Sequence, residues 1–194
     1  MKTLTVGTKN QDKFREIEAI LAGVPVLLQA LPAEAEEVDE TGETLEANAE
    51  LKARGYAQQT GSFCIADDTG LEVDALSGAP GVYSARYAGP QATYADNRVK
   101  MLEELRGVPP GRRQARFRCV VALANPAGEI LARVEGALEG VILEKARGDG
   151  GFGYDPIFAV NGKTLAEISE AEKNALSHRA AALHALRPQL LDLL

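Results

Sequence analysis

Short apolar runs alternate along the chain with segments of helical periodicity, and this alternation limits the fold more than any other feature. The first three apolar runs lie at Thr3–Gly7, Pro25–Ala30 and Ser62–Ala66, and helical patterns occupy Asn10–Leu21 and Thr44–Gln59. A buried strand is a short, nearly continuous apolar run, whereas a helix repeats its apolar residues every three or four positions. Strands that alternate with helices in this way predict an α/β fold.

The middle of the chain adds a β-hairpin to this pattern. Gln114–Ala124 and Ile130–Leu138 alternate or run apolar, and an Asn-Pro-Ala-Gly turn separates them. Helical patterns return at Asp96–Leu105 and at Ser177–Leu194, where we expect a kink near Pro188. We therefore predict one domain over residues 1–194 with a mixed central β-sheet flanked by helices, and ligands tend to bind beyond the carboxyl ends of such strands.

Charge and composition exclude several classes of function. A net charge of −7 argues against binding to a nucleic-acid backbone, which depends on clustered Lys and Arg. Cys64 and Cys119 both lie in apolar runs and are expected to be buried free thiols, and the CxxC and HExxH patterns of zinc sites are absent. The N-terminus lacks a signal-peptide core, and no apolar run approaches the roughly 20 residues that span a bilayer. We expect a cytoplasmic protein that binds neither nucleic acid nor a membrane.

The segment Thr8–Lys13 joins the first expected strand to the first expected helix. Such a turn exposes backbone N–H groups, and the helix dipole adds positive charge, so the turn suits an anion. Lys13 would lie in the first helical turn, where the dipole disfavours a cation by about 0.3–1 kcal/mol. A bound phosphate would reverse that sign, and a solvated lysine is the alternative. The segment does not match the GxxxxGK[ST] pattern of P-loop NTPases.

Asp67 and Asp68 directly follow the third apolar run. Because neighbouring strand residues point to opposite faces, both carboxylates can reach one site only if the strand ends here. We therefore expect Thr69-Gly70 to form a turn and Leu71–Leu76 to form a separate strand. Clustered carboxylates suit Mg²⁺, which one or two of them usually hold together with substrate phosphates, and one carboxylate could instead activate a water. Turn-capping aspartates are the alternative.

The acidic segment Glu34–Glu43 is a solvated charge run by default. Glu40 differs from its neighbours because it precedes Thr41-Gly42, a turn that could aim its side chain inward. Asn48 and Lys52 lie four residues apart on the following helix and therefore share one face.

The segment Gly150–Asp155 is a glycine-rich loop around one aromatic residue. Glycines let a backbone approach a ligand closely, and a ring such as Phe152 suits stacking on a purine base. Asp155 could accept hydrogen bonds from the base or the sugar. A packed loop anchor is the alternative interpretation of Phe152.

Ser177, His178 and Arg179 start the last expected helix, with Ser177 as its N-cap. His178 and Arg179 then oppose the helix dipole, as Lys13 does. Because Arg has only donors, Arg179 aimed at position 6 of a purine would favour a carbonyl there over the amino group of adenine. A surface His-Arg pair is the alternative.

Six segments together resemble the inosine triphosphate pyrophosphatase family, also called XTP/dITP diphosphatases. They are TKNQDK (8–13), ETGET (40–44), NAELKA (48–53), ADDTGLEVDALSGAPGVYSARYAG (66–89), GGFGYDPIF (150–158) and SHR (177–179). The resemblance implies an α/β fold of two lobes with a deep substrate cleft between them, and a homodimer. It also implies hydrolysis of noncanonical purine nucleoside triphosphates (ITP, dITP, XTP) to the monophosphate and pyrophosphate.

The resemblance further implies residue roles. Asp68 would be the general base and a Mg²⁺ ligand, and Glu40 and Asp67 would assist at the metal. The substrate-binding positions would be Thr8, Lys9, Asn10, Gln11, Asp12, Lys13, Lys52, Thr69, Phe152, Gly153, Tyr154, Asp155, Lys173, His178 and Arg179. A Maf-like pyrophosphatase acting on modified pyrimidines or dTTP, and a nucleotide sensor that does not hydrolyse its ligand, remain alternatives.

Overall fold

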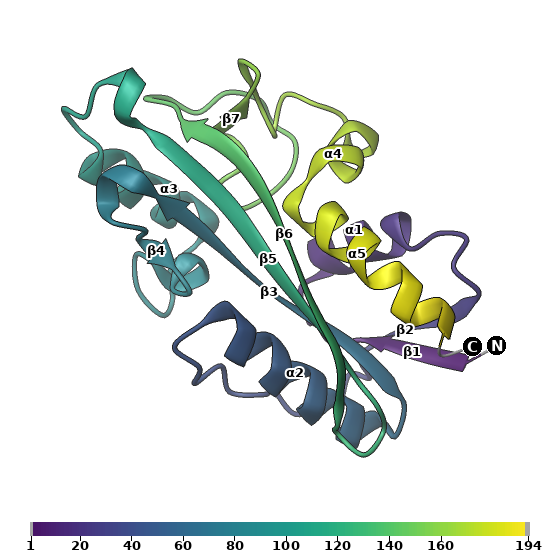
Figure 1. Ribbon diagram of the computed structural model, residues 1–194. Coiled ribbons are helices and arrows are strands. Elements are labelled where there is room, and N and C mark those ends of the chain that lie inside the picture. Colours follow the sequence, from purple (N-terminus) through teal and green to yellow (C-terminus); the bar gives the residue numbers. More distant parts are fainter. Residues whose placement is uncertain (1, 193–194) are drawn as a thin grey trace. The chain divides into compact units, whose positions relative to one another are not determined.

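The computed structural model describes residues 2–192 and contains an eight-stranded sheet with helices packed on it (Figure 1). The strand order is β2-β1-β3-β5-β6-β7-β8, and β4 pairs with β3. β1 pairs in parallel with β2 and β3, whereas β3 pairs with β4 and β6 with β7 in antiparallel fashion. The predicted α/β fold with a mixed central sheet flanked by helices is therefore confirmed.

Two compact units make up the described part of the chain. Unit 1 consists of the described parts of Met1–Asp68, Cys119–Gly136 and His178–Leu194, and unit 2 consists of Thr69–Arg118 and Ala137–Ser177. Three long strands contribute to both units: β3 (Phe63–Val73), β5 (Gln114–Ala124) and β6 (Ile130–Ile142).

Unit 1 also contains two short parallel strands and three helices. They are β1 (Lys2–Val6), α1 (Gln11–Ile20), β2 (Val26–Ala30), α2 (Leu45–Thr60) and α5 (His178–Asp192). In Figure 1, α1 and α5 lie close together beside β1 and β2. Thr44 caps the start of α2, and Gly61 ends it in the left-handed conformation, close to the bounds of the predicted helical segment Thr44–Gln59.

The helices of unit 1 use both faces of β3. Ile65 belongs to the core that α1 and α5 form with β5. Cys64 and Ala66 alternate with it and lie near Tyr56 of α2, since a Cβ on Gly7 would approach all three of these residues within 2.9–3.1 Å. Odd-numbered residues of this part of β3 therefore face α1 and α5, and even-numbered residues face α2.

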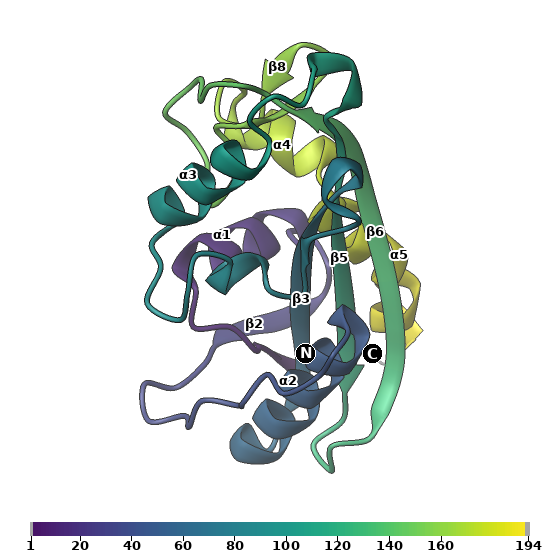
Figure 2. The ribbon, with the colours of Figure 1, turned by 90° about the vertical axis from the view of Figure 1, so that its left-hand side faces the viewer.

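Unit 2 surrounds its own core with shorter elements. They are η1 (Asp74–Leu76), β4 (Pro80–Gly81), η2 (Ser84–Arg86), α3 (Tyr94–Glu104), η3 (Pro110–Arg112), β7 (Phe158–Val160), β8 (Lys163–Thr164) and α4 (Glu170–Leu176). Figure 2 shows α3 and α4 at the same end of the sheet as β8. Leu71, Met101, Phe117 and Phe158 are among the residues that fill this core.

The expected strand end at Asp67 is wrong. β3 continues without interruption from Phe63 to Val73, and Asp74–Leu76 forms a short 3-10 helix rather than the end of a separate strand. The strand can continue because each carboxylate finds partners on its own face of the sheet, so a turn is not needed to satisfy both.

The closing helix α5 begins at His178, directly after Ser177, as predicted. A further helix that was not predicted, α4, precedes it, and Ser177 with extended backbone angles of φ −70° and ψ 158° separates the two. Ser169 and Glu172 start α4 with a reciprocal capping box. Leu193 and Leu194, included in the predicted helix, lie outside the described residues.

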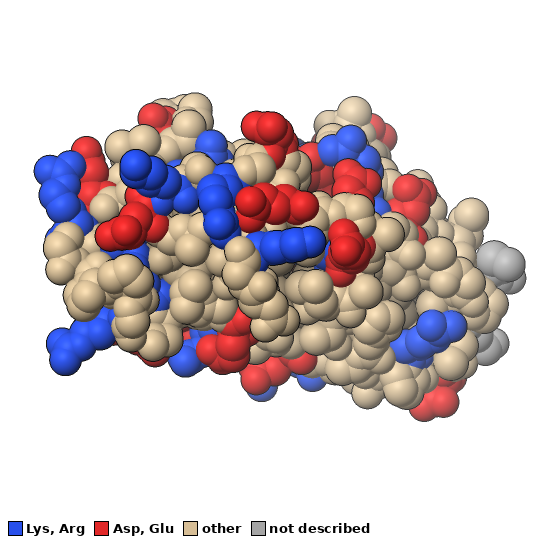
Figure 3. Space-filling model, turned by 90° about the horizontal axis from the view of Figure 1, so that it is seen from above, with Lys and Arg blue, Asp and Glu red and all other residues tan. Residues whose placement is uncertain are grey.

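α3 begins two residues earlier than predicted, because Thr93 and Asp96 form a capping box at its start. Cys64 and Cys119 are buried free thiols, as expected. Among the residues that the structure describes, no helix has the length and apolar character needed to cross a membrane. On the face shown in Figure 3, Lys and Arg are interspersed with Asp and Glu, so that face presents no continuous basic patch.

Candidate active site

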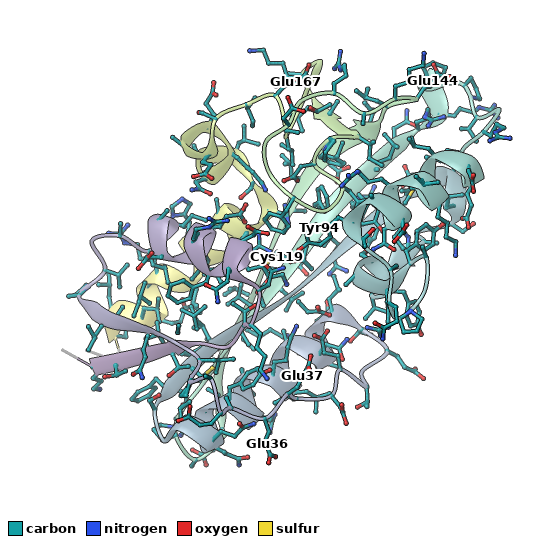
Figure 4. The ribbon with its side chains drawn as sticks, turned by 180° about the vertical axis from the view of Figure 1, so that it is seen from behind. Glu36, Glu37, Tyr94, Cys119, Glu144 and Glu167 are labelled. Atoms are coloured by element: carbon teal, nitrogen blue, oxygen red, sulfur yellow. The ribbon has the colours of Figure 1, made fainter. Side chains whose placement is uncertain are left out.

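Asp67 lies on the face of β3 that packs against α1 and α5. Its Oδ2 atom is 3.1 Å from Nζ of Lys13 and 3.1 Å from Nη2 of Arg179. Sγ of Cys119, a residue labelled in Figure 4, is 3.9 Å from the same oxygen. Arg179 also pairs with Glu16 of α1. Two helix starts and a neighbouring strand therefore converge on one buried carboxylate.

This network explains two cations that lie at unfavourable helix ends. Lys13 is in the first turn of α1 and Arg179 in the first turn of α5, where the dipole opposes positive charge. Burial tends to raise the pKa of the Asp67 carboxyl, but the charges of Lys13, Arg179 and Lys52 outweigh it and hold that pKa well below its usual range. Asp67 is therefore ionised, and it supplies the negative charge that pairs with the cations at both helix starts.

Asp68 lies on the opposite face of the strand, toward α2. Its Oδ1 atom is 3.4 Å from Nζ of Lys52, and its Oδ2 atom accepts a hydrogen bond of 3.3 Å from Nδ2 of Asn48. Oε1 of Glu40 is 3.2 Å from the same Lys52 ammonium. The two carboxylates of Asp68 and Glu40 therefore converge on one point, as the turn after Glu40 suggested.

Asn48 places Glu40 in this arrangement. Its side chain is fully buried, and its Oδ1 atom accepts a hydrogen bond of 2.7 Å from the backbone N–H of Gly42. A Cβ on Gly42 would lie only 2.7 Å from that oxygen, so glycine is required for this approach. Asn48 thereby ties the Glu40 turn to Asp68. Asn48 shares a helix face with Lys52, as the spacing predicts, and it adds to the predicted site residues.

The electrostatic environment of Asp68 differs from that of Asp67. Burial, together with the charges of Glu40 and Asp67, raises the pKa of the Asp68 carboxyl against the opposing effect of Lys52 and Lys13. Burial tends to lower the pKa of Lys52, but Asp68, Asp67 and Glu40 outweigh it and raise that pKa. Lys52 is therefore a firmly charged ammonium, and Asp68 is a carboxylate whose charge is incompletely compensated.

The donor set around Asp68 fits a magnesium ion bound together with a polyanion. Within residues 2–192 there is no group of three or more His, Cys, Asp or Glu side chains arranged to hold a metal. Mg²⁺ does not need one, because it is commonly held by one or two carboxylates, substrate phosphates and waters. Asp68 and Glu40 are two converging carboxylates with a single ammonium between them, which matches that requirement.

The start of α1 already uses part of its hydrogen-bonding capacity. Asn10 caps the helix by accepting from the N–H groups of Asp12 and Lys13 at 2.9 and 3.2 Å. Oγ1 of Thr8 accepts from the N–H of Asn10 at 3.2 Å. Lys9 and Gln11 are exposed, and Asp12 pairs with Arg15 on the surface. Within the segment Thr8–Lys13, Lys13 reaches a buried carboxylate, that of Asp67.

A second cluster lies wholly within unit 2. Oδ2 of Asp155 accepts hydrogen bonds from the N–H of Phe152 at 2.8 Å and from Nζ of Lys173 at 2.6 Å. The same ammonium lies 4.5 Å from the centroid of the Phe152 ring. The hydroxyl of Tyr154 donates to the carbonyl of Ser84 at 2.8 Å. Asp155, which is 3% exposed, thus orders the glycine-rich loop and holds Lys173 against Phe152.

Comparison with known proteins gives a consistent result. The profile of the Ham1 family matches residues 4–189. The chain belongs to the Ham1 family. It is 48% identical to the dITP/XTP pyrophosphatase of Bacillus licheniformis over 99% of both chains. It is 50% identical to the protein of the same name from Geobacter sulfurreducens, over 98% of this chain and 97% of that one.

A solved Ham1 structure supports the same assignment. The structure of a HAM1 protein from Coxiella burnetii superposes with a TM-score of 0.89 at 40% identity, covering 99% of this chain and 100% of that chain. The sequence resemblance to the inosine triphosphate pyrophosphatases, which rested on six short segments, is thereby confirmed over nearly the full length.

In this Ham1 chain the predicted site residues fall into three groups. Lys13, Asp67 and Arg179 meet on one face of β3, and Lys52, Asp68 and Glu40 meet on the other. Phe152, Gly153, Tyr154, Asp155 and Lys173 belong to unit 2, where Thr69 lies half-buried on β3. His178 is buried at the start of α5. Glu16 was not among the predicted site residues, and it joins the first group through its ion pair with Arg179.

Proposed function

We propose that this chain hydrolyses noncanonical purine nucleoside triphosphates, namely dITP, XTP and ITP, to the monophosphate and pyrophosphate with Mg²⁺. The names of its relatives, which match over nearly their whole length, support the substrate class. The observation that carries the chemistry is the convergence of Asp68 and Glu40 on one lysine, since it leaves a net negative point beside a cation that suits phosphate. Membership of the Ham1 family leaves the Maf-like alternative without support.

Asp68 is the proposed general base. A catalytic base works best when its pKa lies near the working pH, and burial moves the pKa of Asp68 in that direction. It would accept a proton from the water that attacks the α-phosphorus. Lys13 and Lys52 would bind the triphosphate, each held in place by a buried carboxylate.

Asp68 and Glu40 are the proposed protein ligands of Mg²⁺. Bound there, the ion would supply positive charge that offsets the charge developing on the leaving pyrophosphate. Asp67 lies on the other face of the strand with Lys13 and Arg179. We therefore assign Asp67 an indirect part, which is to hold Lys13 toward the phosphates.

Phe152 is the proposed stacking surface for the purine base, with Lys173 and Asp155 fixing its loop. His178 and Arg179 remain our candidates for contacting position 6 of the base. A site that donates to a carbonyl there would reject adenine, because buried donors left unpaired cost about 1–3 kcal/mol each.

We further propose that residues 1–194 act as one pyrophosphatase domain with two lobes around the substrate, in a cytoplasmic homodimer. These proposals come from the family resemblance. Sedimentation velocity would test the dimer directly, since a chain of 20.6 kDa should then sediment as a species of twice that mass.

The decisive experiment measures pyrophosphate release from ITP, XTP, dITP, GTP, ATP and dTTP, with Mg²⁺ and with a chelator. We expect release from the first three substrates, little from ATP, and none without the metal. A preference for dTTP would favour the Maf-like alternative. Tight binding of dITP without pyrophosphate release would identify a sensor instead of an enzyme.

A further inference from the structure

Helix α3 contacts two successive residues of the glycine-rich loop, Phe152 and Gly153. Nη1 of Arg98 donates to the carbonyl oxygen of Gly153 at 2.7 Å. Tyr94, one turn earlier on α3, packs on Phe152 with ring centroids 6.0 Å apart and planes inclined by 38°. Figure 4 labels Tyr94 where α3 meets this loop. None of the six family-like segments includes α3.

The helix that provides these contacts is itself firmly held. Asn97 is 2% exposed, accepts from the N–H of Ala88 at 2.8 Å and donates to the carbonyl of Ala85 at 3.1 Å. Lys100 donates to the carbonyl of Tyr87 at 2.8 Å. The segment 85–88, which anchors α3, directly follows Ser84. The carbonyl of Ser84 accepts a hydrogen bond from the Tyr154 hydroxyl of the loop. Arg98 and Tyr94 therefore project from a fixed support.

The loop needs such support because of its composition. Phe152 lies between Gly151 and Gly153, whose φ angles are +67° and +61°. Glycine backbones have many accessible conformations in solution, so an unsupported ring between two glycines must be ordered when a ligand binds. Holding the ring beforehand lowers that cost and raises affinity.

We propose that Arg98 and Tyr94 are positioning residues for base recognition, which hold Phe152 in the orientation that receives the purine ring. This inference rests on the proposed function, in which the base stacks on Phe152. Lys173 secures the ring from α4, and Arg98 and Tyr94 secure it from α3. Because both residues lie in unit 2, they should affect the base and leave the phosphate-binding lysines of unit 1 unchanged.

The first test is independent of any substrate. Hydrogen exchange of the Phe152 and Asp155 amides should be faster in Arg98→Ala than in the wild type, and Arg98→Lys should restore much of the protection. Arg106→Ala is the matched control, because it removes an exposed arginine that directly follows the same helix. Unchanged exchange in Arg98→Ala, or equal acceleration in Arg106→Ala, would overturn the proposal.

The second test separates base from phosphate. In Arg98→Ala we expect the Kd for dIMP and the KM for dITP to rise about five- to tenfold, with kcat changed by less than about twofold. Tyr94→Ala should act similarly, because it removes the ring that packs on Phe152. Binding of inorganic tripolyphosphate with Mg²⁺ should stay the same in every variant.

Two results would contradict this second expectation: unaltered dIMP binding in Arg98→Ala, or an equal loss for tripolyphosphate, which would indicate general damage to the fold. If the wild type releases no pyrophosphate from dITP, the proposed function fails. The exchange experiment still decides whether α3 orders the loop in that case.

Discussion

Asp67 and Asp68 are adjacent in sequence and chemically identical, yet the two faces of β3 give them opposite surroundings. On the Asp67 face, the carboxylates of Asp67 and Glu16 meet the cations of Lys13 and Arg179, so the charges balance. On the Asp68 face, two carboxylates share the single ammonium of Lys52. One face is neutral and built for stability, and the other keeps an excess of negative charge.

Two neighbouring residues of one strand can therefore lie in surroundings of different charge balance. A balanced buried network fixes helices α1 and α5 at their starts, whereas an unbalanced one attracts a further cation. Adjacent carboxylates need not act together at one metal. Their positions on a pleated strand place Asp67 in the balanced network and Asp68 in the network with an excess of negative charge.

The largest expected effect comes from Asp68→Asn. Removal of a general base typically lowers turnover by a factor of about 10²–10⁴, and we expect a loss in that range for dITP. The melting temperature should stay the same or rise, because the fold disfavours the charged form of Asp68. Pyrophosphate release and thermal unfolding would measure the two effects.

Asp39→Asn is the matched control for Asp68→Asn, since it neutralises an exposed carboxylate of the acidic segment. It should leave turnover near the wild-type value. Turnover retained in Asp68→Asn would show that Asp68 is not the base.

Asp67→Asn should affect stability most. It leaves Lys13 and Arg179 without their buried counter-charge, and breaking such a pair costs about 3–5 kcal/mol of unfolding free energy. Denaturant unfolding is the measurement. Asp12→Asn removes a surface pair with Arg15 and should cost less than about 1 kcal/mol. Equal stability of Asp67→Asn and the wild type would disprove the structural assignment of this face.

A smaller effect is expected from Asn48→Ala. The N–H of Gly42 would lose its acceptor, at a cost of about 1–3 kcal/mol, and Glu40 would lose its fixed position. We expect turnover to fall by roughly tenfold, the equivalent of about 1.4 kcal/mol. Asn125→Ala is the control, because Asn125 orders the hairpin turn by accepting from Ala127 and Glu129 at 3.0 Å. If both variants lose the same activity, the effect is not specific to Asp68.

The smallest expected effect is on how the free energy of unfolding varies with pH. It is measured with a chelator present. The lowered pKa of Asp67 means that its stabilisation is complete above the unfolded value of about 3.9 and is lost as the pH falls below it. The raised pKa of Asp68 has the opposite sign, so its ionisation weakens the fold as the pH rises above about 3.9. The difference in unfolding free energy between Asp67→Asn and the wild type should therefore change below that pH. The difference between Asp68→Asn and the wild type should change above it.

The sequence predicted the element types of unit 1 well because their signals are local. Thr44 and Gly61 bound α2, and Asn10 caps α1, as their residue types indicate. The turn after Glu40 indicated that its side chain could point inward, and the Glu40 carboxylate does reach the ammonium of Lys52. Such features depend on a few neighbouring residues, so a pattern can reveal them.

The course of β3 could not be predicted in the same way. Two consecutive aspartates suggest a strand end unless each has a cation on its own side, and those cations come from residues as distant as Lys13 and Arg179. Asn48 and Arg98 were missed for the same reason, since their partners are backbone groups that only the folded chain brings close. Long-range pairing, rather than local propensity, decided these points.

The unbroken course of β3 has a consequence for how this protein can vary. A strand repeats every two residues, so inserting or deleting one residue before Asp67 would turn both carboxylates over at once. The reacting group would then face the helices, and the helix starts would lose their counter-ion. The number of residues in this stretch of β3 is therefore itself a constraint on the chain, because it decides which face of the strand each carboxylate occupies.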